Sequence, residues 1–319
     1  MIKQIINNRR AAITGALAIC ISASLWGFDG VVLTPNLFNL EIGYVVFMLH
    51  LIPFVIMNIF LYREYRYVRN FTKSDIFIFL LVALLGGALG TLSIVKALFL
   101  VEFKKLSIVI LLQKTQPVFA IALAAIILRE RPRKGYYLWA TVAIAAGYFL
   151  AFGFNIPHIE SNIKTIYASV FSLIAAASFG SGTVLSKKIL NRYSFHTATF
   201  YRYGFTTLLM LIYVIGTGSI RQIFITTPLN WLIFLIIAFT TGSGAIFLYY
   251  YGLKNVSAMV STICELCFPL VAILLDYTIN KQHLKPVQWL SAATLLFAIV
   301  MLNLRQASPG NQNRKTAKS

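Results

Sequence analysis

The chain has 319 residues, of which 59% are hydrophobic and only 12% are charged, and its mean hydropathy is +0.78. An ordinary soluble domain carries about 25% charged residues, so this composition excludes a soluble globular protein and indicates a polytopic membrane protein. The net charge of +19 does not indicate nucleic-acid binding, because the basic residues stand in short clusters between apolar runs, which is the pattern that orients membrane helices.

Ten apolar segments follow one another along the chain, each near the roughly 20 residues that a helix needs to cross a bilayer. They span residues 11–33, 42–61, 76–99, 106–128, 135–154, 165–186, 197–217, 230–252, 257–279 and 286–304. The connections on the same side of the membrane as the N-terminus carry roughly three times as many Lys and Arg residues as the connections on the opposite side. This distribution predicts that both termini are cytoplasmic. We expect a multi-pass protein of a bacterial inner membrane, with a disordered basic tail at residues 306–319.

The two halves of the chain resemble each other. Residues match at offsets of 152 to 155: Trp26 with Phe179, Gly27 with Gly180, Ala83 with Ala238, Gly87 with Gly242, and Pro117 with Pro269. Five segments in each half is an odd number, so the second half inserts in the opposite orientation. We therefore predict an all-α integral membrane protein with ten transmembrane helices. They form two inverted five-helix repeats, residues 1–155 and 160–305, around a central cavity.

The fourth and ninth segments carry polar residues near their middle, followed by a proline. The fourth contains Gln113 and Lys114 before Pro117, and the ninth contains Glu265 before Pro269. A lysine at a helix centre costs about 2.5 to 3.5 kcal/mol on insertion scales, so these helices are expected to line a polar interior. Because Glu265 corresponds to Gln113 in the repeat, we expect these two side chains to face one cavity from opposite walls.

Three charged side chains are candidates for contact with a substrate. Asp29, in the outer half of the first segment, either pairs with a cation, with Lys114 as first partner, or binds an amine or a proton. Lys114 either closes that salt bridge or binds a carboxylate or phosphate of the substrate. Glu265 has no basic residue near it in sequence, so it is the best candidate for a protonatable coupling group or an amine ligand.

Two aromatic residues and a histidine complete the predicted binding site, which comprises Lys114, Glu265, Asp29, Gln113, Trp26, Tyr250 and His50. Tyr250 is the middle of three consecutive tyrosines that span most of a helical circumference, so at least one ring faces inward, and Trp26 can join it. Aromatic rings in a cavity suit a quaternary amine or an aromatic group. Interfacial belt positions are the alternative for the tyrosines. His50 is more typical of an interhelical hydrogen bond than of a proton relay.

Enzyme and metal sites are not indicated. The sequence has no H-E-x-x-H or G-x-S-x-G motif, and its histidines are scattered. Cys264 and Cys267 have C-x-x-C spacing, but they lie within an apolar segment without a second pair, which is typical of packing thiols. We therefore predict no catalytic residue, no metal and no cofactor.

The chain resembles the EamA type of the drug/metabolite transporter superfamily over nearly its whole length. The resemblance rests on S-L-W-G at Ser24 to Gly27, on L-L-Q-K-T-Q-P-V-F-A and L-R-E-R-P in the first half, and on C-E-L-C-F-P-L-V-A-I-L-L-D-Y at Cys264 to Tyr277. One departure is Gln282, where many members have Glu after the ninth helix. The resemblance implies a ten-helix fold with a central cavity that moves amino acids, amines, nucleotide sugars, phosphorylated sugars or drugs.

We expect a secondary transporter that moves a small metabolite by alternating access. Both charge signs in the interior favour a zwitterion such as an amino acid, with Lys114 binding the carboxylate and Glu265 or Asp29 the amine. The alternatives are an exporter of cationic amines or drugs, which requires that Asp29 neutralise Lys114, and an intramembrane scaffold or enzyme whose buried charges are structural. The expected partners are a small-molecule substrate and membrane lipid, without nucleic acid. A coupling proton, a counter-substrate and a homodimer are left open.

Overall fold

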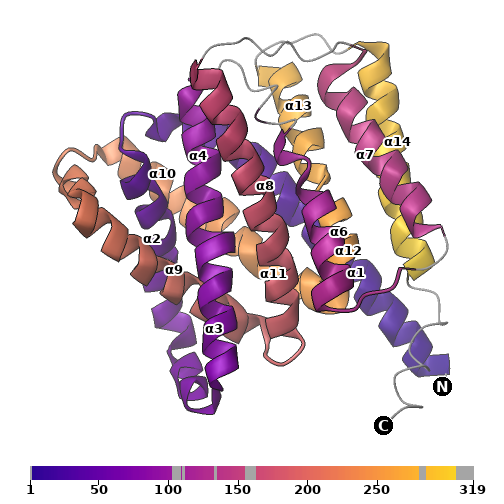
Figure 1. The fold of residues 1–319 in the computed structure, drawn as a ribbon, viewed down its shortest axis with the longest axis horizontal. Coiled ribbons are helices and arrows are strands. Elements are labelled where there is room, and N and C mark those ends of the chain that lie inside the picture. Colours follow the sequence, from indigo (N-terminus) through magenta and orange to yellow (C-terminus); the bar gives the residue numbers. More distant parts are fainter. Residues whose placement is uncertain are drawn as a thin grey trace.

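The computed structural model describes residues 2–102, 109, 112–132, 135–154, 163–279 and 285–306. The described residues are helices and short connections, and no strand occurs among them, which confirms the all-α class. The helices form a bundle in which α1 begins and α14 ends at the same end (Figure 1). The predicted disordered tail beyond Gln306, the departure at Gln282 and the boundary between the repeats near residues 155–160 lie outside the described residues.

In the first half, three long stretches are each assembled from consecutive helical pieces, and two shorter helices follow. The pieces are α1 (Ile2–Phe28), η1 (Asp29–Leu33) and η2 (Thr34–Leu37), then α2 (Ile42–Leu61) and η3 (Tyr62–Asn70), then α3 (Lys73–Leu81), η4 (Val82–Leu89) and α4 (Gly90–Leu100), then α6 (Gln116–Ile127) and α7 (Tyr136–Phe152).

The second half repeats this order of long and broken helices. It comprises α8 (Ile163–Leu190), α9 (Phe195–Thr217) and η5 (Ser219–Phe224), then α10 (Pro228–Ile237), η6 (Ala238–Gly242) and α11 (Ser243–Asn255), then α12 (Ala258–Cys264), α13 (Cys267–Ile279) and α14 (Pro286–Gln306).

In the part of the chain that the structure describes, seven stretches are long and apolar enough to cross a bilayer. They are Arg9–Leu37, Ile42–Asn70, Lys73–Leu100, Ile163–Leu190, Phe195–Thr217, Pro228–Asn255 and Ala258–Leu275. The other three predicted segments contain the shorter apolar helices Gln116–Ile127, Tyr136–Leu150 and Pro286–Leu302. The chain is thus a multi-pass membrane protein, and the count of ten spans stays a prediction.

The two polar segments are interrupted where the sequence places their polar residues. Turns occupy Lys114 and Thr115 before α6, and Glu265 and Leu266 between α12 and α13. Pro117 lies in the first turn of α6, where its missing N–H leaves no helical bond unmade. Broken helices at membrane depth are tolerated where they are buried in protein or line a cavity, so both breaks indicate an internal polar site.

Glycine contacts repeat between the halves. A Cβ atom on Gly27 of α1 would lie 2.6 Å from the carbonyl oxygen of Phe268, at the start of α13. A Cβ atom on Gly180 of α8 would lie 3.0 Å from the carbonyl oxygen of Gln116, at the start of α6. The partners Gln116 and Phe268 are 152 residues apart, and the glycines are 153 apart. The pair α1–α13 therefore packs as the pair α8–α6 does, with backbones in direct contact.

Three spans contain a wide helical turn of the π type, at η1, η4 and η6. The segment η6 (Ala238–Gly242) matches residues 83–87 of η4 at the offset of 155, so the two halves share this irregularity. Such segments occur frequently at functional sites, because the extra residue turns the following side chains and leaves some backbone groups unpaired. All three contribute residues to the cavity described next.

Candidate functional site

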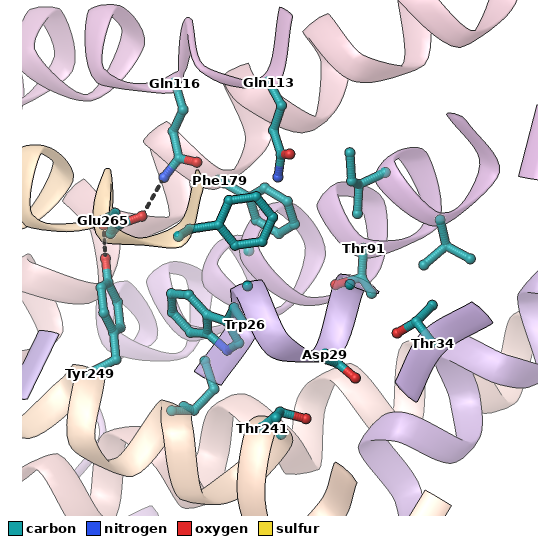
Figure 2. Close-up of a pocket in the computed structure, with 18 of the residues that line it drawn as sticks. Trp26, Asp29, Thr34, Thr91, Gln113, Gln116, Phe179, Thr241, Tyr249 and Glu265 are labelled. Carbon is teal, nitrogen blue, oxygen red and sulfur yellow. Dashed lines mark hydrogen bonds between the residues drawn. The ribbon is translucent and has the colours of Figure 1, made fainter. Parts of the chain in front are cut away.

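A cavity of about 310 Å³ lies in the middle of the bundle and is lined from both halves. The first half contributes α1, η1, η2, α2, η4, α4 and α6, and the second contributes α8, α9, α10, η6, α11, α12 and α13. This volume is at the lower end of the range for pockets that hold small organic ligands, roughly 300 to 1,000 Å³. Figure 2 shows the central part of this cavity.

Six of the seven predicted binding residues line the cavity: Trp26, Asp29, His50, Gln113, Lys114 and Glu265. Tyr250 is not among the lining residues, and its neighbour Tyr249 is. The Tyr250 hydroxyl instead bonds Ser186 at 2.7 Å and accepts a bond from Arg202 at 3.2 Å. Consecutive helical residues point about 100° apart. The run of three tyrosines predicts an inward ring, but the choice of Tyr250 needs correction, because Tyr249 is the one that lines the cavity.

Glu265 is held by uncharged donors. Its carboxylate accepts hydrogen bonds from the side-chain amide of Gln116 at 2.7 Å and from the Tyr249 hydroxyl at 2.8 Å. Ser261 adds a longer one at 3.4 Å. Because Gln116 comes from the first half, this carboxylate links the two halves across the cavity (Figure 2). The residue that reaches Glu265 is thus Gln116, one helical turn beyond the Gln113 that the repeat singled out.

Asp29 and Lys114 do not form the expected ion pair. Lys114 Nζ and Asp29 Oδ1 are buried, and neither has a hydrogen-bond partner within the described residues. Asp29 opens the wide turn η1, which places it beside Thr34 and Thr241 (Figure 2). Of the two alternatives for these residues, the structure does not show the ion pair. Both groups line the cavity, where a ligand can meet them.

Aromatic rings form part of the cavity wall. The rings of Trp26 and Tyr249 lie 5.3 Å apart between centroids at an angle of 54°. Phe179, the repeat partner of Trp26, lines the same cavity, as does Phe268 beside the break in the second half. We did not predict Phe179 as a site residue from the sequence, although its match with Trp26 could have indicated it.

Arg202 of the seventh segment was not among the predicted site residues, yet it lines the cavity and donates to the Gly86 carbonyl oxygen at 2.7 Å. Its guanidinium also lies over the Tyr250 ring, 5.5 Å from the centroid. His50 was expected to bond another helix, but its Nδ1 bonds Val46 of its own helix at 2.8 Å. The wide turn η4 presents the Gly86 carbonyl that holds Arg202 inside.

The fold and the cavity define a membrane transporter rather than an enzyme. The model of the EamA-like transporter family matches residues 13–153 and 166–304, so the chain belongs to this family and carries two copies of its unit. The transporter class implies a small-molecule substrate and a membrane location.

Relatives of known name agree with this class. The chain is 49% identical over 292 residues to "Riboflavin transporter ImpX" of Fusobacterium nucleatum subsp. nucleatum, covering 91% of this chain and 98% of that protein. It is 28% identical over 207 residues to "Uncharacterized transporter YwfM" of Bacillus subtilis, covering 64% of each. The chain also shares its fold with the solved structure "Crystal structure of protein". The TM-score is 0.64 at 14% identity, over 93% of this chain and 97% of that one. The amino-acid substrate that we predicted from the buried charges finds no support in these names.

Proposed function

We propose that this chain carries riboflavin, or a flavin close to it, across a bacterial inner membrane. The observation that carries the proposal is the 49% identity to a riboflavin transporter along 98% of that relative's length. The cavity supports it, because it combines aromatic rings with hydrogen-bonding side chains. The amine-exporter alternative is not favoured, since it required Asp29 to neutralise Lys114, and neither of the two buried atoms has a hydrogen-bond partner in the described residues.

Riboflavin fits this chemistry. Its tricyclic ring is flat and apolar on both faces, so Trp26 and Phe179 suit it better than they suit a small zwitterion. One edge of the ring is pyrimidine-like, with both donors and acceptors, which an amide such as that of Gln113 can pair. Riboflavin is uncharged at neutral pH and needs no counter-ion. Asp29 and Lys114 therefore serve as hydrogen-bonding groups and do not bind an opposite charge on the ligand.

The transport mechanism in this proposal is alternating access between two inverted five-helix repeats. The matching glycine contacts of α1–α13 and α8–α6, the paired breaks at Lys114 and Glu265, and the paired wide turns η4 and η6 support the repeat. The proposal includes ten spans, with one repeat at residues 1–155 and the other at residues 160–305, and it places both termini in the cytoplasm. A site where two repeats meet near the midplane is the place where rocking of one half exposes a ligand to either side.

Binding and uptake of riboflavin test the proposal. The purified full chain in detergent is titrated with riboflavin and, separately, with amino acids and quaternary amines, and its melting temperature is followed, because a ligand that binds the folded state raises it. We expect stabilisation by riboflavin alone, and uptake of labelled riboflavin into proteoliposomes. Trp26→Ala should abolish both effects. Trp289→Ala, at a tryptophan that is 47% exposed outside the cavity, is the matched control. Stabilisation by an amine with none by riboflavin would overturn the proposal.

A further inference from the structure

The cavity has two ends of different chemistry. Gln116, Glu265 and Tyr249 lie at one end with the Trp26 ring beside them, whereas Asp29 and Thr34 lie at the other (Figure 2). Thr241 belongs to the second group (Figure 2). An elongated ligand with unlike ends therefore has a preferred direction in this cavity.

At the end around Asp29, two side-chain oxygens are free to bond a ligand. Asp29 Oδ1 and Thr241 Oγ1 are both buried, and neither has a hydrogen-bond partner in the described ranges. An unpaired buried oxygen is costly, and a carboxylate is a stronger acceptor than a neutral oxygen. Hydroxyl groups of a ligand can satisfy both, because a hydroxyl donates to the carboxylate and can also accept from a threonine.

At the opposite end, the polar groups already satisfy one another. Both oxygens of Glu265 accept hydrogen bonds, one from Gln116 and the other from Tyr249. What this end offers a ligand is ring surface, with Trp26 tilted at 54° to Tyr249. An aromatic ligand surface can lie here without leaving a buried polar group unpaired, whereas hydroxyls placed here would meet apolar rings.

We infer that Asp29, with Thr241, binds the ribityl chain of the flavin and sets the direction in which it lies, with its ring against Trp26. The inference rests on the proposed flavin transport and goes beyond it, because it assigns the recognition of the polyhydroxylated chain to particular residues. In the reverse direction the ring edge opposite the ribityl chain would face Asp29. That edge carries a ring nitrogen and a carbonyl oxygen, which accept hydrogen bonds and would leave the buried carboxylate oxygen unpaired. Asp29 is therefore a specificity-determining residue that requires hydroxyls on the ligand.

The test compares two ligands that differ only in the chain. Riboflavin and lumiflavin share the ring, but lumiflavin has a methyl group in place of the ribityl chain. Binding to the full chain in nanodiscs is followed by quenching of flavin fluorescence. Wild type is expected to bind riboflavin at least tenfold more tightly than lumiflavin. Asp29→Asn should weaken riboflavin about tenfold or more and leave lumiflavin within about twofold, since a hydrogen bond to a charged group is worth about that much.

Two further variants control the experiment. Trp26→Ala should weaken both flavins by the same factor, because both carry the ring. Thr241→Val should follow Asp29→Asn in weakening riboflavin alone. Thr240→Val, at the exposed neighbour whose hydroxyl bonds Ile236 of its own helix, should change neither. Thr241→Val decides the matter if Asp29→Asn does not fold.

Each outcome has a distinct meaning. If the wild type binds lumiflavin as tightly as riboflavin, or if Asp29→Asn and Thr241→Val weaken both flavins equally, the assignment of the ribityl chain is overturned while flavin transport stands. If the wild type binds neither flavin, the proposed function itself fails. Weakening of riboflavin alone in both variants, with no effect of Thr240→Val, supports the inference.

Discussion

The carboxylate of Glu265 joins the two halves of the chain at a single residue. Gln116 reaches it from α6 and Tyr249 from α11. Removing this acceptor takes away the bond that the Gln116 amide makes, whereas the Tyr249 hydroxyl keeps Thr183 at 2.7 Å. A buried donor left unpaired costs about 1 to 3 kcal/mol. The same residue therefore contributes to the wall of the cavity and to the stability of the bundle.

We predict that Glu265→Ala lowers the free energy of unfolding by about 2 kcal/mol, because Gln116 loses its acceptor and Tyr249 keeps only its bond with Thr183. Glu265→Gln should cost about half as much, since the amide retains one oxygen. Denaturant titration in detergent measures both. Glu41→Ala is the control, because Glu41 also accepts two side-chain bonds but is exposed. Equal losses for the Glu265→Ala and Glu41→Ala variants would contradict the prediction.

Residues that carry charge within apolar segments were predictable as site residues, and their partners were not. Asp29 and Glu265 stand out because a charge at membrane depth is costly, and both line the cavity. Pairing with Lys114, one of the two alternatives for Asp29, does not occur because η1 is a wide turn that directs the side chain towards Thr241, and nothing in the local sequence indicates such a turn. The sequence thus predicted how deep in the membrane each charged side chain lies, but not the direction in which it points.

At the scale of elements, close contact between helices depends on glycine at two repeat-related positions. The backbone of α1 meets α13 at Gly27, and α8 meets α6 at Gly180. Small residues allow this approach, and in a membrane such packing replaces the hydrophobic effect as the force that holds helices together. The match of Trp26-Gly27 with Phe179-Gly180 made the equivalence of the two glycines predictable from sequence, but not the helix that each contacts. The paired wide turns η4 and η6 were not predictable, because they depend on how a helix accommodates an extra residue under tertiary packing.

We predict that Gly27→Ala destabilises the protein by about 1 to 3 kcal/mol, because the new methyl group would lie 2.6 Å from the Phe268 carbonyl oxygen, which is backbone. Gly180→Ala should act in the same direction and less strongly, since its nearest atoms are at 3.0 Å. Gly147→Ala, in the middle of α7, meets nothing within 4 Å and should be neutral or stabilise by up to about 1 kcal/mol through helix propensity.

Melting temperatures of the three alanine variants in one detergent measure these effects. The result that would contradict the packing argument is a Gly27→Ala variant as stable as wild type. A loss of stability in Gly147→Ala would show instead that any added methyl group in a helix is harmful, and the argument from close contact would then lose its basis.

For the whole molecule, the sequence predicted the class of protein and not its cargo. Apolar segments of bilayer length, with the matches of Trp26-Gly27 to Phe179-Gly180 and of Pro117 to Pro269, sufficed for an all-α transporter, because bilayer thickness and backbone hydrogen bonding leave few alternatives. Buried charges suggested a zwitterion, but they are compatible with a neutral ligand once each is read as a hydrogen-bonding group. Substrate choice depends on the direction of a few side chains around the cavity, which sequence spacing does not determine.

The orientation of the protein in the membrane depends on the distribution of basic residues along the whole chain. The connection η3, after α2, and the connection η5, after α9, lie at opposite ends of the bundle (Figure 1). The segment η3 contains several of the basic residues that the distribution of Lys and Arg assigns to the cytoplasm. We predict that a cysteine at Arg66 reacts with a membrane-impermeant maleimide only after cells are opened, and that a cysteine at Phe224 reacts in intact cells. Both positions are exposed, so reactivity reports the side of the membrane.

The labelling requires a variant without native thiols, and such a variant needs only three substitutions. Cys264 and Cys267 are buried and Cys20 is half-buried, so alanine at all three positions removes competing sites while changing little surface. Riboflavin uptake by that variant shows that the fold is intact before either probe is introduced. Labelling of the cysteine at position 66 in intact cells, with protection of position 224, would reverse the topology. The basic clusters would then face outward, and the charge distribution would have to be explained by something other than the rule that orients membrane helices.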